Sequence, residues 1–358
     1  MEIPCVRSSA DVSIQPPTLT IQRSRRLVRV FSALLVFAVA VAAQAQQYTK
    51  IVVFGDSLSD TGNDAIVFNA TYGFPFPSPL GDYTLGRFTD GPDTIPAAEN
   101  YFGVWVEQLA EALPAHPWVM PSLIGGTNFA YGYSNTFGGT TLFNLTGTPY
   151  TIVVQNVGSQ IDEYLATHPK IDSHTLFVVW GGANNLTEAV GASDAAGQIV
   201  DGALAQVDNI QRLIHAGATQ FLIPNLPDLG SVPRFNSSPV DSAAFHDATV
   251  LYNTTLGAGV DLLPIFNFTR HLTIQKLDVY GLLKGIIASP ENYGLVNVTD
   301  PSQAMAVDPD TYLFWDDLHP TTRGHNLLGQ AALETIEPRG CLVMISGEYV
   351  GAAAPGCR

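Results

Sequence analysis

The sequence predicts a single α/β domain of three layers, α/β/α, in which helices cover both faces of a mainly parallel, doubly wound sheet. Two observations lead to this fold class. Strand-like and helix-like segments alternate along the chain after residue 50, as they do in parallel α/β folds. Several strand-like segments are also unbroken apolar runs, of which residues 176–180 are the clearest, and such runs are typical of parallel strands covered on both faces.

The expected elements follow this alternation as far as residue 336. Strands are expected at residues 50–54, 127–131, 175–180, 219–223 and 272–277. Helices are expected at residues 104–113, 158–168, 194–216, 242–263 and 321–336, where apolar side chains recur with helical spacing. Residues 63–100 are rich in Gly and Pro, which predicts a long loop. No linker or repeat interrupts the pattern, so residues 46–337 are expected to form one domain.

Residues 1–45 have the pattern of a secretory signal peptide with a long leader. Arg23, Arg25 and Arg26 precede an apolar stretch, and Ala43-Gln44-Ala45 supplies small residues for cleavage. The apolar stretch is shorter than the roughly 20 residues that a membrane-spanning helix needs, which favours a cleaved signal over a signal anchor. The protein is therefore expected to be secreted and extracellular.

The mature chain is strongly acidic. Removal of residues 1–45 takes away five of 16 basic and two of 32 acidic residues, which leaves a formal net charge of −19. This charge disfavours nucleic acid and anionic membrane surfaces as partners, and we expect a monomer without stable membrane association. Cys5 leaves with the leader, and in an oxidising compartment Cys341 and Cys357 are expected to form a disulfide within the tail at residues 338–358.

Seven Asn-x-Ser/Thr sequons fit a secreted glycoprotein. Six of them are expected to carry glycans: Asn69, Asn144, Asn236, Asn253, Asn267 and Asn297. The seventh, Asn185, lies in a segment with candidate site residues. We expect no glycan there.

The most informative segment follows the first expected strand. Residues 50–54 run into Gly55-Asp56-Ser57-Leu58, a tight turn that presents a serine at the carboxyl edge of the sheet. Open α/β sheets bind ligands at that edge. A serine there can act as a nucleophile if the chain supplies a base and an oxyanion site. A polar turn without a catalytic role is the alternative interpretation.

Two later segments contain candidate oxyanion donors. Residues 125–132 end in Gly132, whose backbone N–H can approach a ligand closely because glycine has no Cβ. Residues 181–185 follow the most apolar strand and include Asn184, whose amide can donate to developing negative charge without itself becoming charged. Ordinary turn residues remain the alternative for both.

Residues 314–321 supply a candidate base. His319 can accept a hydroxyl proton near neutral pH, and Asp316 precedes it by three residues. Asp317 competes for the role of orienting the imidazole, and the Asp-x-x-His spacing favours Asp316. The other histidines have no such motif and are expected to be structural: His116, His168, His174, His215, His246, His271 and His325.

Together these motifs resemble the GDSL esterase and lipase family, also called SGNH hydrolases. The resemblance begins with Phe-Gly-Asp-Ser-Leu-Ser-Asp-Thr-Gly-Asn at residues 54–63 and includes Asn-Phe-Ala-x-Gly ending at Gly132. It continues through Asn184 and closes with Asp-x-x-His at residues 316–319. Where the family pattern has Asp after this asparagine, the chain has Asn185, which puts the local geometry in doubt.

The resemblance implies an SGNH-hydrolase, flavodoxin-like fold and a triad of Ser57, His319 and Asp316. It implies that the oxyanion is bound by the backbone N–H groups of Ser57 and Gly132 and by the side chain of Asn184. Residues 85–91 and 223–230 resemble two further stretches of the family, which we interpret as scaffold. No Gly-x-Ser-x-Gly elbow surrounds Ser57, which disfavours an ordinary α/β-hydrolase.

The implied activity is hydrolysis of carboxylic esters through an acyl-enzyme, with no cofactor and no metal. Some secreted fungal members resembling this pattern are carbohydrate acetylesterases, which favours deacetylation of plant-derived carbohydrate. A lipase or phospholipase acting on longer acyl chains is the alternative, with Phe74, Phe76, Tyr131, Phe137 and Trp315 as candidate groove residues. A catalytically silent carbohydrate-binding protein is the third hypothesis.

Overall fold

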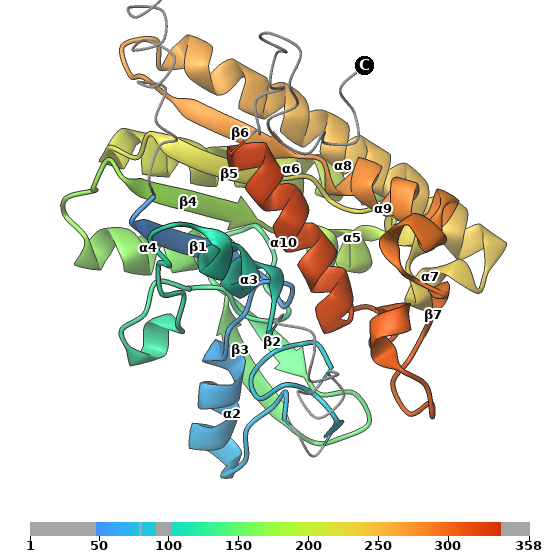
Figure 1. The fold of residues 1–358 in the computed structure, drawn as a ribbon. Helices are drawn as coiled ribbons and strands as arrows, with labels where there is room; N and C mark the ends of the chain where they lie inside the picture. Colours follow the sequence, from blue (N-terminus) through green and yellow to red (C-terminus); the bar gives the residue numbers. More distant parts are fainter. Residues whose placement is uncertain (1–47, 79–80, 91–101, 338–358) are drawn as a thin grey trace, which may run out of the picture. The chain divides into compact units, whose positions relative to one another are not determined.

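A parallel sheet forms the centre of the computed structural model, which describes residues 48–78, 81–90 and 102–337. The sheet has four strands in the order β1-β4-β5-β6 (Figure 1). These strands are β1 (Lys50–Gly55), β4 (Thr175–Trp180), β5 (Gln220–Pro224) and β6 (Thr273–Leu277). Four of the five expected strands are thereby confirmed. The predicted leader and the two tail cysteines lie outside the described residues.

The central strands are apolar because both of their faces are covered. Every residue of β4 is buried, and β1 is buried from Ile51 onwards. The two strands pair in parallel from Lys50 opposite Thr175 to Gly55 opposite Trp180. Their carboxyl ends therefore lie side by side, and the turns that follow them share one edge of the sheet.

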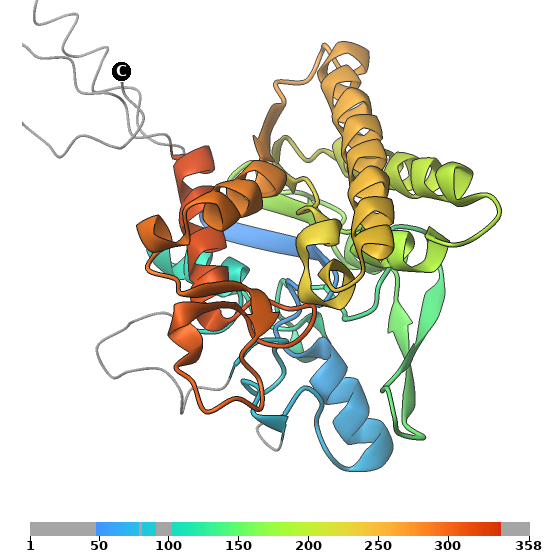
Figure 2. The same cartoon turned by 90° about the vertical axis from the view of Figure 1, so that its right-hand side faces the viewer.

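Helices cover both faces of this sheet, which confirms the three-layer prediction. On one face α3 (Trp105–Ala112) packs against α10 (Thr322–Ile336), and α10 also contacts β6. On the other face α6 (Ala195–Ala216) packs against α4 (Val157–Thr167) and α8 (Pro239–Phe266). Figure 2 shows the red α10 and the yellow-orange α8 on opposite sides of the blue strand β1. All five expected helices are present, with ends shifted by at most a few residues.

The predicted loop at residues 63–100 is wrong at its start, where α2 (Asn63–Tyr72) begins at once. The helix begins here because the carboxylate of Asp60 caps its first turn, a signal that the Gly- and Pro-rich composition of the segment hides. Oδ1 of Asp60 accepts hydrogen bonds from the N–H groups of Gly62 (2.8 Å) and Asn63 (2.7 Å), and Oδ2 accepts from that of Asp64 (3.1 Å). These bonds satisfy N–H groups that a helix start leaves without partners.

The expected strand at residues 127–131 is also wrong as a regular strand. This segment runs beside β1 and bonds to it through Val53 N–H to Thr127 O (3.0 Å), Phe129 N–H to Val53 O (2.8 Å) and Tyr131 N–H to Gly55 O (3.3 Å), but the pairing amounts to one isolated bridge between Val53 and Asn128. The side chain of Asn128 also bonds the backbone, donating to the carbonyl of Ser59 (2.6 Å) and accepting from the N–H of Ala130 (2.9 Å).

Several short elements at the rim of the domain are absent from the prediction. Strands β2 (Thr140–Asn144) and β3 (Thr151–Gln155) form an antiparallel hairpin, and β7 (Asn297–Pro301) pairs with β8 (Tyr312–Phe314). The short α-helices are α5 (Ala183–Ala189), α7 (Pro233–Asn236) and α9 (Val279–Ala288). Short 3₁₀ helices occupy Ser122–Ile124, Leu229–Ser231, Pro290–Tyr293 and Pro309–Thr311.

A second, aromatic core joins α2 to the hairpin. Its buried members include Phe68, Phe88 and Phe143. The rings of Phe68 and Phe143 meet edge to face, with their centroids 5.7 Å apart. This cluster attaches the hairpin to the rest of the domain and, as described below, forms one wall of a cleft. Across the described part of the chain, no helix combines the length and apolarity needed to cross a membrane.

Candidate active site

Ser57 stands two residues beyond the end of β1, on a turn that the backbone holds tightly. The carbonyl of Asp56 accepts from the N–H groups of Ser59 (3.0 Å) and Asp60 (3.1 Å), while its carboxylate accepts from Leu58 N–H (3.1 Å). The preceding residue must be Gly55, since a Cβ there would lie 2.5 Å from the carbonyl oxygen of Trp180. The sequence therefore directs the chain out of the sheet at a fixed point.

A buried glutamine holds the backbone of Gly55 at the end of β1. Gln160 of α4 accepts from Gly55 N–H through Oε1 and donates to the Gly55 carbonyl through Nε2, both at 2.9 Å. The side chain is fully buried, so both backbone groups of Gly55 are satisfied without water. Sequence reasoning missed Gln160, because a glutamine within a helix carries no local signal of such a contact.

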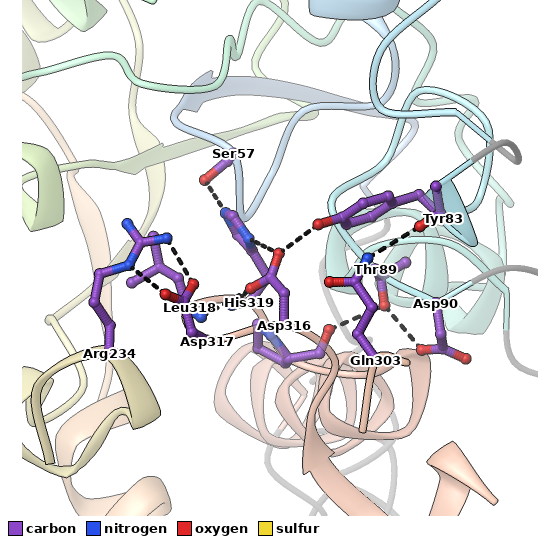
Figure 3. Close-up of polar contacts among 12 residues, drawn as sticks. Ser57, Tyr83, Thr89, Asp90, Arg234, Gln303, Asp316, Asp317, Leu318 and His319 are labelled. Carbon is purple, nitrogen blue, oxygen red and sulfur yellow. Dashed lines mark hydrogen bonds and ion pairs between the residues drawn. The ribbon is translucent and has the colours of Figure 1, made fainter. Parts of the chain in front are cut away.

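The structure brings His319 to Ser57 from the other end of the domain. His319 Nε2 lies 2.9 Å from Ser57 Oγ, and His319 Nδ1 lies 2.7 Å from Asp316 Oδ2 (Figure 3). Ser57 and His319 are separated by 262 residues in the chain and are only 8% and 7% exposed. The three side chains thus form a continuous chain of polar contacts, in which Asp316 contacts His319 as the Asp-x-x-His motif predicts.

Asp316 receives four hydrogen bonds. Oδ1 accepts from the N–H groups of Leu318 (2.8 Å) and His319 (2.6 Å), and Oδ2 accepts from the hydroxyl of Tyr83 (2.9 Å) as well as from the imidazole. Burial opposes ionisation of this carboxyl, but the neighbouring His319 and the backbone donors outweigh it and lower the pKa of Asp316 to about 2. The group is therefore a carboxylate at any pH near neutrality.

Asp317, the competing carboxylate, points elsewhere. It forms an ion pair with Arg234, whose Nε and Nη2 lie 3.1 Å and 2.7 Å from its two oxygens. Figure 3 shows this pair on the side of His319 away from Tyr83. Asp316 alone of the two contacts the imidazole.

Asn184, in the first turn of α5, lies beside the serine. Its Nδ2 donates to the carbonyl of Ser134 (2.9 Å), which fixes the amide and leaves its second N–H for another acceptor. The helix start is set by Gly182, whose φ of +124° is a backbone conformation that favours glycine, and a Cβ there would lie 2.3 Å from the ring of Tyr252.

Gly132 is enclosed by its own protein. A Cβ at this position would stand 2.4 Å from Asp64 Oδ2 and 2.8 Å from Cζ of Phe88. The packing around this position therefore requires a glycine. The neighbours that impose the requirement, however, are a buried carboxyl and an aromatic ring.

Asn185 replaces the usual aspartate of the family pattern and is buried. Its Oδ1 accepts from Thr136 N–H (3.0 Å), a bond that a carboxylate oxygen could also accept, while its buried Nδ2 has no hydrogen-bond partner among the described residues. A Cβ on Gly202 of α6 would lie 2.9 Å from Asn185 Nδ2, which shows how closely α6 covers this amide.

Three aspartates of the serine turn are buried, and their charges are unfavourable. Burial raises the pKa of both Asp56 and Asp60 to about 6 despite their backbone hydrogen bonds. Burial and the nearby negative charge of Asp60 raise the pKa of Asp64 well above its ordinary value. Asp64 is the member of this set that sequence reasoning missed, since its neighbour Gly132 lies far along the chain.

The segment of residues 81–90 fastens the histidine loop. Thr89 Oγ1 donates to the carbonyl of Pro320 (3.0 Å), and Asp90 Oδ1 accepts from Thr322 Oγ1 (2.8 Å) and from the Thr322 N–H. The interpretation of residues 85–91 as scaffold is consistent with these contacts. Tyr83 is more than scaffold, because it touches Asp316 directly.

Two cavities open at Ser57. One is narrow, about 90 Å³, and is lined almost entirely by apolar side chains. The other is a wider cleft of about 740 Å³ with mixed polar and aromatic walls. Of the five aromatic residues predicted for a groove, only Phe76 lines one of these two cavities, and Tyr131 and Trp315 are buried.

Comparison with known proteins identifies the family. The family model described as GDSL-like lipase/acylhydrolase matches residues 51–332. The chain belongs to this family. Its membership puts the protein among GDSL-type ester hydrolases, and it agrees with the α/β fold and with the position of the serine after β1.

Individual relatives are distant. The thermolabile hemolysin of Vibrio parahaemolyticus is 26% identical over 82% of this chain and 65% of its own length. The phosphatidylcholine-sterol acyltransferase of Aeromonas hydrophila is 24% identical over 85% of this chain and 95% of its own length. A GDSL esterase/lipase of Arabidopsis thaliana is 26% identical over 83% of this chain and 92% of its own length. The chain spans 52% of Lipase 1 from Photorhabdus luminescens.

Among solved structures, a member of the lipolytic protein G-D-S-L family from Veillonella parvula is similar with a TM-score of 0.42 and 14% identity. The similarity covers 80% of this chain and 96% of that one.

Replacing Asp64 by Asn should change how stability depends on pH. Because the folded-state pKa of Asp64 is raised, the folded chain binds more protons than the unfolded chain above about pH 4, so stability falls as pH rises. Asp64→Asn removes this contribution, and its free energy of unfolding should therefore improve relative to wild type between pH 5 and 8. Urea unfolding across that range measures the difference.

The matched control is Asp247→Asn, which alters an exposed carboxylate on α8. Its stability should follow the wild type at every pH. A constant difference between Asp64→Asn and wild type from pH 5 to 8 would contradict the assignment of a costly buried charge to Asp64.

Proposed function

We propose that the protein is a serine ester hydrolase in which Ser57 is the nucleophile, His319 the general base and acid, and Asp316 the group that orients the imidazole. The observation that carries this proposal is the unbroken chain of contacts from Ser57 Oγ through His319 to Asp316, at 2.9 Å and 2.7 Å. A serine hydroxyl is a weak nucleophile until a neighbouring base accepts its proton. His319 Nε2 is within range to do so.

The reaction follows from this geometry in two halves. Ser57 Oγ bonds to the ester carbonyl carbon as its proton passes to His319 Nε2, and the imidazolium then protonates the departing alcohol oxygen. Water attacks the acyl-enzyme by the same route and gives up a proton to His319; the imidazolium then returns this proton to Ser57 Oγ as the bond from Oγ to the acyl carbon breaks and the acid product leaves. Asp316 remains ionised throughout, because its pKa of about 2 lies far below the working range, and its charge favours the imidazolium form.

The oxyanion formed in each half is bound, in this proposal, by the backbone N–H groups of Ser57 and Gly132 and by Asn184 Nδ2. The support for Asn184 is its contact with the space around Ser57 and the fixed orientation of its amide by Ser134. The support for Gly132 is its match to the Asn-Phe-Ala-x-Gly pattern. Loss of one oxyanion donor typically lowers the rate about 10²–10³-fold.

The natural ester is proposed from two lines of support. The relatives that match over most of this chain bear names of lipases, a hemolysin and a phosphatidylcholine-sterol acyltransferase, which favours acyl esters of lipid type. Deacetylation of plant-derived carbohydrate is the second candidate. It draws support from the signal peptide pattern, the sequons and the aromatic and polar walls of the wide cleft. Acetate release from acetylated oligosaccharides, compared with acid release from phospholipid, distinguishes the two.

We further propose that the chain is secreted and carries glycans. Asn69 and Asn144 are the strongest acceptors, since both side chains are exposed. Asn253 and Asn267 are weaker acceptors, because their Nδ2 atoms donate to backbone carbonyls of Leu226 and Leu263, each at 2.8 Å. Asn236 and Asn297 are half-buried and also donate through Nδ2.

Ser57→Ala should abolish hydrolysis of p-nitrophenyl butyrate while the thermal unfolding midpoint stays close to that of the wild type. Asn184→Ala should retain the nucleophile and lower kcat by about 10²–10³-fold. A serine-directed phosphonate, followed by peptide mass spectrometry, should label wild type at Ser57 and leave Ser57→Ala unlabelled. Full activity in Ser57→Ala would refute the mechanism.

Tyr83→Phe should lower kcat several-fold, about 3- to 10-fold, with little change in KM, because a hydrogen bond to a charged group is worth about 1.5–3 kcal/mol and only part of that bears on the transition state. The hydroxyl holds Asp316 Oδ2 at the imidazole and does not itself contact the serine. Tyr72→Phe is the matched control, since its hydroxyl bonds Thr151 in the hairpin. Equal losses of kcat in both variants would show that the effect is general.

Glycopeptide mass spectrometry should find Asn185 unmodified. This amide is 3% exposed and is covered by α6, so a glycan on its Nδ2 is incompatible with the folded site. Asn69 and Asn144 serve as positive controls in the same digest. High occupancy at Asn185 would contradict both the packing of α6 and the site built beside it.

A further inference from the structure

The two cavities approach Ser57 from different sides and share very little wall. The residues that line both are Ser57, Asn184, Leu318 and His319. An ester whose carbonyl lies at Ser57 Oγ therefore has one side directed into the narrow cavity and the other into the wide cleft. The difference in polarity between the two cavities indicates which side of the ester each one binds.

The narrow cavity is apolar beyond the reacting groups. It runs from the serine turn past Leu229 and Val232, which follow β5, to α9 and the start of α10. Helix α9 contributes Val279, Leu282, Leu283 and Ile286, whose spacing of three and four residues sets them on one face of the helix. No lysine or arginine lines this cavity, and its one carboxylate, Asp56, is bonded to Leu58 N–H.

An aliphatic chain fits this environment and a polar alcohol does not. A sugar or glycerol hydroxyl moved into the narrow cavity would lose its water and find no partner on α9, which is unfavourable. Each methylene of an acyl chain gains by leaving water, by an amount that corresponds to roughly fourfold in an equilibrium or rate ratio. An acetyl group has no methylene to place there.

The wide cleft has the opposite character. Its walls combine the rings of Phe76, Phe88 and Tyr133 with polar groups, among them Gln303 and the ion pair of Arg234 with Asp317. Aromatic faces beside hydrogen-bonding side chains can contact a polar alcohol portion while it keeps water around it. The cleft is also large enough to take alcohol portions of different sizes.

We propose that the narrow cavity is the acyl-chain site of this hydrolase and that α9 sets the length of chain it accepts, while the wide cleft takes the alcohol portion. The proposal rests on the serine mechanism above and deepens it by naming the substrate class: esters of aliphatic acids longer than acetate. Leu282, half-buried on the cavity face of α9, is the specificity-determining residue with most freedom to change size.

A series of p-nitrophenyl esters from acetate to dodecanoate tests this. In the wild type kcat/KM should rise about fourfold per methylene beyond acetate until the chain fills the cavity, and then fall. Leu282→Phe should move the maximum to a shorter chain and lower the octanoate-to-acetate ratio about tenfold, with acetate little affected. Leu282→Ala should move the maximum to a longer chain. Lys284→Ala, on the exposed side of α9, is the control and should keep the wild-type profile.

Labelling of Ser57 by the phosphonate in the same samples separates the two levels of the proposal. If labelling is complete and kcat/KM is highest for acetate in the wild type, the acyl-chain site is wrong and the serine mechanism stands. If the wild type prefers longer chains but both Leu282 variants keep its profile, α9 does not set chain length and the proposal fails in that form. If Ser57 is not labelled at all, the proposed function fails, and the acyl-chain site fails with it.

Discussion

The meeting of Ser57 and His319 depends on how the turn between β8 and α10 is anchored. Thr321 caps α10 through Gly324 N–H (3.0 Å) and donates back to the Tyr312 carbonyl (2.8 Å), so the helix start and the strand before it form one unit. Gly324 allows this closeness, because a Cβ there would lie 2.8 Å from Leu313 O. The clamp from Asp90 to Thr322 then ties the unit to the segment that carries Tyr83. The distances from His319 to Ser57 and to Asp316 depend on these contacts.

The same site concentrates groups that do not favour folding. The turn that presents Ser57 buries three aspartates, and burial raises the pKa of each, so their ionised forms weaken the folded state as pH rises. Asp60 is compensated by the three N–H groups at the start of α2, and Asp56 by Leu58 N–H. Asp64 has the weakest compensation. The turn that presents Ser57 is thus held in shape by polar groups whose burial is itself unfavourable, as is common where a site needs rigid geometry.

Much of this arrangement could be predicted from sequence because its signals are local. The apolar run of β4, the turn after β1 and the Asp-x-x-His spacing each lie within about ten residues, and each led to the correct element or contact. The contacts that were missed join segments far apart in the chain. Tyr83 reaches Asp316 across 233 residues, and Gln160 reaches Gly55 across 105, so neither leaves a pattern in its own neighbourhood. The segment at residues 127–131 also has a contact of this kind, since the side chain of Asn128 bonds Ser59, 69 residues earlier in the chain.

Helix α9 is fixed at its start and belongs to a different part of the chain from the triad. Asp278 caps it by accepting from Gly281 N–H (2.9 Å), and Asn225, at the end of β5, bonds both Asp278 (2.8 Å) and Tyr280 N–H (2.9 Å). These bonds fix the start of the helix, while the side chains on its cavity face also pack into the apolar core. Under the proposed mechanism, substitutions along that face alter which esters the enzyme accepts, while Ser57, His319 and Asp316 lie in other segments of the chain. One scaffold can in this way give rise to related enzymes that catalyse a common reaction on different substrates.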